Sequence, residues 1–338
     1  MSFQRFQKAT SANIVYTGPN QALGPDSITN ASNYNKFAKN VGGNVNWVTL
    51  PLPDVTTTPS TQDQYAVVFD FASQSFVLRR IPIPYNLLTD ANVRYAFIPN
   101  ATSTTFTTGS LSLIQNVGVT GSTYNISNIQ MGNNTVLDTG NQGLKFNGVT
   151  LMSLTGAFPS TANNAFVFAV KEAWAGSTNP STLMRSMAPS ATNTNSDVNL
   201  QYYYNGTNAT ANITVMNNGF NNSSIPQSGN NLYIISLLCN SGVTYLYVNG
   251  VLRAQTTRQT FYNNNLEQML FFNGETNSAF YNSMRWVGTA FAWMALENAT
   301  LQSVQRAEGW IKWSSSANGQ PWILDASHPY ALQGPTTN

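Results

Sequence analysis

Short runs of apolar and β-branched residues, separated by polar turns, recur along the chain from about residue 88 onward. They occupy residues 165–170, 211–216, 232–238, 269–272 and 284–296. Runs of this length and composition predict β-strands. Because no helical segments alternate with them, the pattern predicts an all-β fold, a β-sandwich or jelly roll.

Three Asn-Gly dipeptides accompany these runs and predict tight hairpin turns. Asn249-Gly250 lies between the runs 244–248 and 251–254, Asn147-Gly148 lies within the run 144–151, and Asn205-Gly206 follows three consecutive tyrosines. Both central residues of a type I′ turn need positive φ, which Asn and Gly adopt most readily. We therefore expect a hairpin at each dipeptide.

One helix is expected late in the chain, over residues 300–313. Leu301, Val304, Ala307 and Ile311 fall on one face of a helix at this position. A single helix after a long series of strands is expected to cap one face of the sandwich.

The N-terminal part has a different character. Residues 1–62 are rich in Asn, Gly and Pro and end in a polar stretch at 56–62, which is typical of an extended arm or an ordered loop segment. Residues 65–83 predict a hairpin with strands at 66–71 and 75–81. The expected organisation is an N-terminal docking arm, residues 1–88, followed by a sandwich domain, residues 89–338.

Charge is sparse in this chain. Charged residues make up 8%, with 15 basic against 13 acidic side chains, while Asn, Thr and Ser number 44, 37 and 31. This balance offers no basic surface to nucleic acid or to an anionic membrane, and no apolar run reaches the roughly 18 residues of a membrane span. A neutral polar surface fits a subunit packed in an assembly. A biased genome composition explains the same counts equally well.

Three stretches, in order, resemble the concanavalin A-like lectin/glucanase family, the laminin-G-like jelly roll. The first is 143–151 (GLKFNGVTL) with the strand 165–170, and the second is 232–237 through the Val248-Asn249-Gly250 hairpin. The third is 286–293 (WVGTAFAW), the helix 300–313 and a final His328-Pro-Tyr. This ending is similar to the tail of such domains in phage and large-virus virion proteins. Gly250 and Gly288 match scaffold positions, and His328 is interpreted as a packed C-terminal staple.

Enzymatic members of the family that the chain resembles are glucanases with two carboxylates spaced two apart on a strand. Here the closest acidic pair is Asp63 and Asp70, so we expect no enzyme activity. A carboxylate pair contributed by separate strands is the remaining route to a hydrolase. One cysteine, Cys239, and one histidine do not make a zinc site of the usual type.

A calcium ion is the one cofactor that the sequence leaves open. Asp138 and Asp197 lie in loops among several asparagines, and calcium prefers carboxylate and carbonyl oxygens. Two Asx-rich turns account for the same residues without any metal.

Glycan binding would use aromatic faces with planar amides beside them. Trp174, Tyr203 and Asn205 are the residues assigned to such a site. Tyr203 is expected on the opposite strand face from Tyr202 and Tyr204, because successive side chains alternate. Packing of these rings in the sandwich core or rim is the alternative.

The leading hypothesis is a non-enzymatic virion structural protein, a component of capsid decoration, spike or tail. Its expected partners are other virion proteins and further copies of itself, with residues 1–88 docking it to its neighbours. The alternative is a carbohydrate-binding adhesin that recognises a host-surface polysaccharide.

Overall fold

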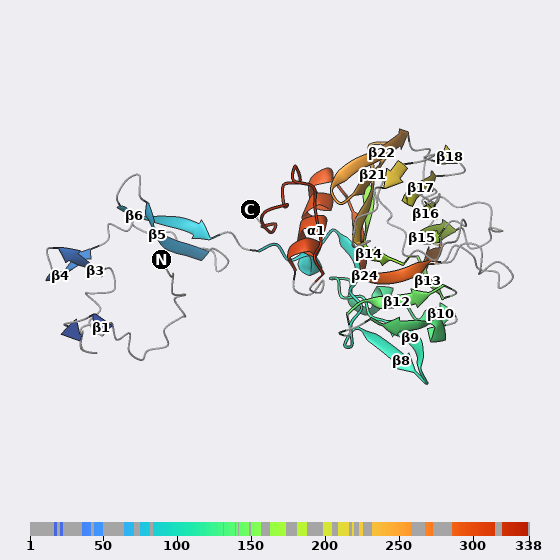
Figure 1. Cartoon of the computed structure of the whole chain (residues 1–338), viewed down its shortest axis with the longest axis horizontal. Helices are drawn as coiled ribbons and strands as arrows, with labels where there is room; N and C mark the ends of the chain where they lie inside the picture. Colours follow the sequence, from blue (N-terminus) through green and yellow to red (C-terminus); the bar gives the residue numbers. More distant parts are fainter. Residues whose placement is uncertain are drawn as a thin grey trace. The chain divides into compact units, whose positions relative to one another are not determined.

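The computed structural model describes residues 84–336 and the backbone of six strands before them. Gaps in this description fall at 131, 139, 141, 149, 157–162, 174–180, 188–198, 205–208, 216–217, 220–222, 226–231, 258–267, 273–285 and 315–319. The chain divides into two units, Met1–Ile83 and Pro84–Asn338 (Figure 1). Residues 84–88, assigned above to the arm, belong to the second unit: Pro84 forms a β-bridge with Thr336, and Leu87 is buried.

Within the first unit the structure describes three antiparallel strand pairs. The longest of them pairs Tyr65 with Arg80 and Phe69 with Phe76, over the segment for which the sequence predicts a hairpin. The paired strands are β1 (Thr17–Gly18) with β2 (Gln21–Ala22), β3 (Lys36–Val41) with β4 (Asn44–Thr49), and β5 (Gln64–Asp70) with β6 (Ser75–Ile81).

The second unit is a jelly-roll β-sandwich of two antiparallel sheets, the predicted fold class. The helix-covered sheet runs in the order β11 (Thr135–Leu137), β12 (Leu144–Asn147), β24 (Val287–Glu297), β14 (Asn164–Glu172), β20 (Leu232–Asn240), β21 (Val243–Val248) and β22 (Val251–Thr257), with β7 (Val93–Phe97) also on β24. The opposite sheet runs β10 (Asn128–Gln130), β13 (Leu151–Thr155), β23 (Gln268–Phe271), β15 (Ser181–Met187), β16 (Asn199–Tyr204), β17 (Ala209–Val215) and β18 (Asn218–Gly219), with β19 (Ser223–Ile225) also on β17.

Short elements link these strands. They are η3 (Leu87–Thr89), the hairpin β8 (Thr104–Thr107) and β9 (Ser110–Ile114), η4 (Gly121–Tyr124) and η5 (Gly132–Asn134). The predicted helix is present as α1 (Leu301–Trp313) and begins with a capping box in which Thr300 and Ser303 bond each other's backbone.

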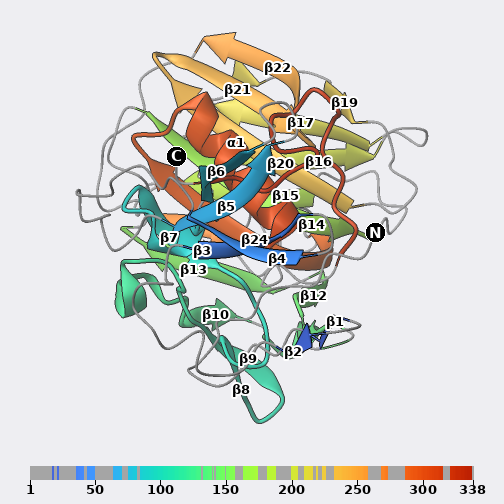
Figure 2. The ribbon, with the colours of Figure 1, turned by 90° about the vertical axis from the view of Figure 1, so that its left-hand side faces the viewer.

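The central strands of the helix-covered sheet, β24, β14 and β20, are buried on both faces, which explains why they read as continuous apolar runs. One face packs between the sheets, where the Phe271 ring of the opposite sheet lies 6.1 Å from that of Trp293. The other face lies under α1, which crosses β14 and β20 (Figure 2). Val304, Ala307 and Ile311 face this layer as predicted, whereas Leu301 is 41% exposed, contrary to its assignment to the apolar face.

The outcome of the hairpin prediction differs among the three Asn-Gly dipeptides. At Asn249-Gly250 both residues take positive φ, 52° and 81°, and join β21 to β22 as predicted. Asn205-Gly206 lies outside the described residues, within the connection of the antiparallel pair β16–β17. The prediction at Asn147-Gly148 is wrong, because β12 pairs with β24 while β13 pairs with β23 of the opposite sheet. This dipeptide therefore carries the chain from one sheet to the other.

None of the described helices combines the length and apolarity that a membrane crossing requires.

Candidate functional site

The C-terminal segment packs over α1 and is held there by a buried polar network. His328 Nε2 lies 3.0 Å from Oε2 of Glu308 on α1. The other oxygen of that carboxylate accepts a hydrogen bond of 2.7 Å from Ser236 Oγ on β20. The backbone N–H of Tyr330 donates to His328 Nδ1 at 3.2 Å, so this network assigns the imidazole proton to Nε2. A neutral imidazole and a serine hydroxyl thus both donate to one buried carboxylate.

Two glycines leave the room that this segment needs. Gly250 has φ 81°, and a Cβ there would lie 2.7 Å from His328 Cδ2. A Cβ at Gly309 would lie 2.6 Å from the Cβ of Tyr330. Both distances are shorter than carbon atoms tolerate, so any larger residue would push the tail off the helix.

The order in which Ser236, Glu308 and His328 are hydrogen-bonded differs from that of a catalytic triad and is that of a packing contact. In a serine nucleophile the hydroxyl bonds to a histidine that a carboxylate orients. Here the hydroxyl of Ser236 bonds to the carboxylate instead, and the three side chains are buried. The interpretation of His328 as a packed C-terminal staple is confirmed.

A second buried carboxylate lies at the end of β14. Glu172 is 3% exposed, and Trp286 Nε1 donates a hydrogen bond of 2.6 Å to its Oε1. Burial raises the pKa of Glu172 from 4.5 to about 8, although the bond from Trp286 opposes the shift. Gly288 makes room for the indole, because a Cβ there would lie 2.6 Å from Trp286 Cζ2 and 2.4 Å from the backbone oxygen of Lys171.

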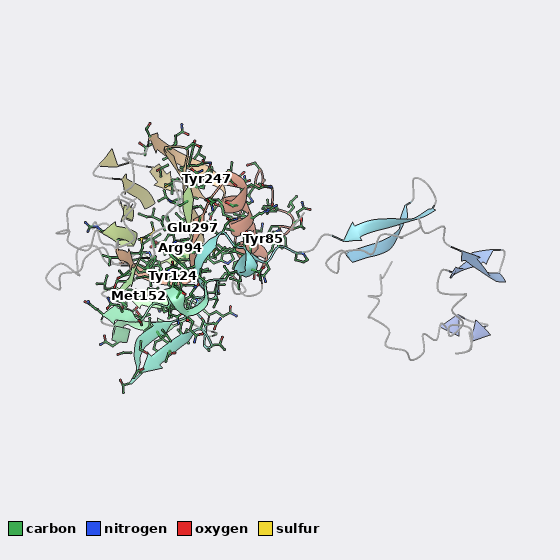
Figure 3. The ribbon with its side chains drawn as sticks, turned by 180° about the vertical axis from the view of Figure 1, so that it is seen from behind. Tyr85, Arg94, Tyr124, Met152, Tyr247 and Glu297 are labelled. Carbon is green, nitrogen blue, oxygen red and sulfur yellow. The ribbon has the colours of Figure 1, made fainter. Side chains whose placement is uncertain are left out.

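A partly exposed ion pair joins the first strand of the sandwich to the last. Arg94 on β7 contacts Glu297 at the end of β24, and its Nη2 donates to the backbone oxygen of Gly156 at 2.9 Å. The guanidinium carbon lies 5.0 Å from the centre of the Tyr124 ring (Figure 3). These contacts give Arg94 a structural role in fixing β7 against β24.

Of the two aspartates proposed to bind calcium, the structure describes Asp138 alone. Asp138 is half-buried, its Oδ2 accepts a hydrogen bond of 2.9 Å from Thr289 Oγ1, and its backbone N–H donates to the oxygen of Gly143 at 3.0 Å. These bonds fix the turn between β11 and β12. Asp197 lies outside the described residues. No group of three or more His, Cys, Asp or Glu suited to a metal occurs in the described part of the chain, and calcium binding stays a prediction.

The proposed glycan residues stay predictions as well. Trp174 and Asn205 lie outside the described residues. Tyr203 lies on β16, opposite Thr210 of β17, and its side chain is not among those described.

A solvent-exposed tryptophan ends α1. Trp313 is 49% exposed, whereas the other tryptophans with described side chains are buried, namely Trp286, Trp293, Trp310 and Trp322. The Trp313 Nε1 donates to the backbone oxygen of Tyr330 at 2.8 Å, which fixes the indole against the tail. The Lys312 ammonium lies 5.3 Å from the centre of the same ring and donates to the oxygen of Ala331.

The tail that packs along Trp313 carries two exposed side chains just before Gly334. Leu332 is 90% exposed and Gln333 is also exposed. Gly334 brings the tail back alongside Trp313, with 3.6 Å between the Trp313 Cβ and the position of a Cβ at Gly334. We call Lys312, Trp313, Leu332 and Gln333 the Trp313 platform.

A second cation lies over an aromatic ring where the sandwich begins. The Arg306 guanidinium on α1 lies 5.7 Å from the centre of the Tyr85 ring, and Figure 3 labels Tyr85 at this side of the sandwich. The Tyr85 hydroxyl donates a hydrogen bond of 2.6 Å to Asp90 Oδ2. Burial and this carboxylate raise the pKa of Tyr85 above its ordinary value of 10.

The sequence carried a signal for the Trp313 platform that the strand-based reasoning missed. Trp313 follows Ile311 by two positions, which places it about 160° away around a helix of 3.6 residues per turn. A tryptophan on the polar side of an amphipathic helix is therefore expected at the surface. Its fixed orientation depends on the tail, which the pattern of the helix does not reveal.

No protein-family model matches the chain, and no curated protein matches it. Among solved structures it is similar to a Trypanosoma rangeli sialidase, with 13% identity, a TM-score of 0.46 and coverage of 64% of this chain and 33% of that one. It is also similar to the binding domain of botulinum neurotoxin serotype D/C, with 12% identity, a TM-score of 0.45 and coverage of 66% and 53%. A third similarity, to domain 4 of a Geobacillus stearothermophilus GH43 arabinanase, has 14% identity, a TM-score of 0.37 and coverage of 50% and 78%. The chain thus spans a third to a half of the first two structures.

Proposed function

We propose that this chain is a non-enzymatic structural protein of a virion surface. In this proposal the N-terminal unit docks on neighbouring virion proteins and on further copies of the chain. The sandwich supplies assembly contacts and a surface for attachment to a host. The source of the virion assignment is the resemblance of the C-terminal tail to virion domains of this fold.

The burial of three titratable side chains supports the proposal that the chain is not an enzyme. Its single histidine, His328, is enclosed in a packing contact with Glu308. Glu172, the other buried glutamate among the described residues, accepts a hydrogen bond from the buried Trp286 indole. A general acid or base must reach its substrate, and burial of these three side chains opposes that role.

Fractionation of purified particles tests the proposal. The chain is expected to sediment with the particles through a density gradient and to stay bound after washing in moderate salt. Recovery of the chain only as a free monomer, with none in the particle fractions, would contradict a structural role.

The second candidate function is a carbohydrate-binding adhesin, and the exposed, fixed indole of Trp313 favours it. A panel of glycans probed with the full chain, with and without calcium, tests this candidate. A calcium requirement would point to the loops of Asp138 and Asp197. Substitution of Trp174 or Tyr203 should abolish cell binding and leave particle assembly intact if those residues form the site.

A further inference from the structure

We infer that the Trp313 platform is a binding site for an acidic polysaccharide. The inference rests on the attachment role proposed above and assigns it to the end of α1 and the C-terminal tail. The occupant is a chain of sugars that carry carboxylate groups.

The Trp313 indole is exposed and yet held in one orientation. Trp313 keeps half of its surface open to water, at 49% exposure, although a fully buried indole would stabilise the fold. Its ring is nevertheless fixed, because Nε1 donates to Tyr330 and the ring lies beside Gly334. A ring that is already ordered loses little conformational entropy when a ligand stacks on it.

The Trp313 ring and the Gln333 amide offer the kinds of contact that a sugar makes. The face of an aromatic ring carries negative charge density and attracts the polarised C–H groups of a sugar. Gln333 offers an amide that both donates and accepts hydrogen bonds, as sugar hydroxyls require. Gln333 directly precedes Gly334, which packs against Trp313, so an exposed amide and an exposed ring lie on adjoining parts of the tail and the helix end.

The positive charge near the ring selects the class of sugar. Lys312 lies at the ring itself, and Arg306 lies on the same helix seven residues before Trp313. The nearby carboxylate Asp90 already accepts a hydrogen bond from Tyr85, and Glu308 is buried beneath the tail. In a chain with only 8% charged residues, one cation at the exposed indole and a second about two helical turns before it favour an anionic ligand.

Affinity electrophoresis of the full chain tests the inference with polygalacturonate as the acidic probe and dextran as the neutral one. The chain is expected to be retarded by polygalacturonate, with the retardation weakened by salt, and to run unretarded in dextran. Trp313→Ala should raise the dissociation constant for polygalacturonate at least tenfold, about 1.4 kcal/mol, and Trp313→Phe should restore part of the loss. Lys312→Gln should weaken the same binding and reduce its salt dependence.

Leu301→Ala is the matched control, because it removes another exposed apolar side chain from the same helix. It should bind as the unmodified chain does, and the circular dichroism spectrum of each variant should show that it is folded at the assay temperature. Unchanged binding by Trp313→Ala would overturn the site while leaving the attachment role intact. Absence of binding by the unmodified chain, or equal binding of dextran, would overturn the ligand class. A self-association that Trp313→Ala abolishes in the absence of polysaccharide would assign the surface to a second copy instead.

Discussion

Replacement of Glu172 by glutamine is expected to stabilise the sandwich increasingly as pH rises above about 4.5. Burial raises the pKa of this carboxyl to about 8 from 4.5. Between these values the folded chain holds a proton that the unfolded chain has lost. The unfolded state then binds fewer protons, so the free energy of unfolding falls as pH rises from about 4.5 to about 8.

The magnitude follows from the shift. A difference of about 3.5 pKa units at about 1.4 kcal/mol each sets an upper limit of about 5 kcal/mol for the stability lost across this window. Glutamine cannot ionise, and its oxygen can still accept the hydrogen bond of Trp286. Glu172→Gln should therefore match the unmodified chain near pH 4.5 and exceed it increasingly toward pH 8.

Urea denaturation followed by tryptophan fluorescence measures this difference at a series of pH values. Glu172→Ala is the informative second variant, because it leaves the buried Trp286 N–H without its acceptor. It should be less stable than Glu172→Gln by about 1–3 kcal/mol at every pH. If Glu172→Gln and the unmodified chain lose stability in parallel between pH 5 and pH 8, burial does not raise the pKa of Glu172.

Three further predictions concern the staple and the chemistry. Gly250→Ala should lower the free energy of unfolding by about 1–3 kcal/mol, since the new Cβ meets His328 at 2.7 Å and φ is positive. Amide hydrogen exchange in residues 328–331 should accelerate in this variant. Unchanged exchange would contradict the role of the turn in holding the tail. Ser236→Ala should lower the free energy of unfolding by about 1–3 kcal/mol, because the buried Glu308 carboxyl loses a hydrogen-bond partner. A chemical denaturation curve that superimposes on that of the unmodified chain would refute it. Incubation of the full chain with β-glucans should release no reducing ends above background, with or without calcium, and release that depends on the chain would show that it is an enzyme.

Local turn chemistry explains both what the sequence predicted correctly and where it failed. Asn249-Gly250 closes a hairpin because the flanking strands are also neighbours in one sheet. Asn147-Gly148 has the same residue types, yet the strands around it belong to different sheets. A dipeptide sets the backbone of a turn and carries no information on the partners of the strands that it joins.

The candidate site shows the same limit at longer range. The helix at 300–313 and the packing role of His328 could be predicted from spacing and from the resemblance. The partners of Glu308 could not, because Ser236 lies 72 residues before it and no local pattern connects them. The fixed orientation of Trp313 likewise depends on a tail that begins after the helix ends.

Cross-linking of lysines in intact particles, read out by mass spectrometry, tests the central claim most directly. The chain has three lysines in its N-terminal unit, Lys8, Lys36 and Lys39, and three in the sandwich, Lys145, Lys171 and Lys312. The proposed docking role predicts cross-links to neighbouring virion proteins from the first three. Cross-links to virion proteins through the sandwich lysines alone, or the absence of the chain from particles, would contradict it.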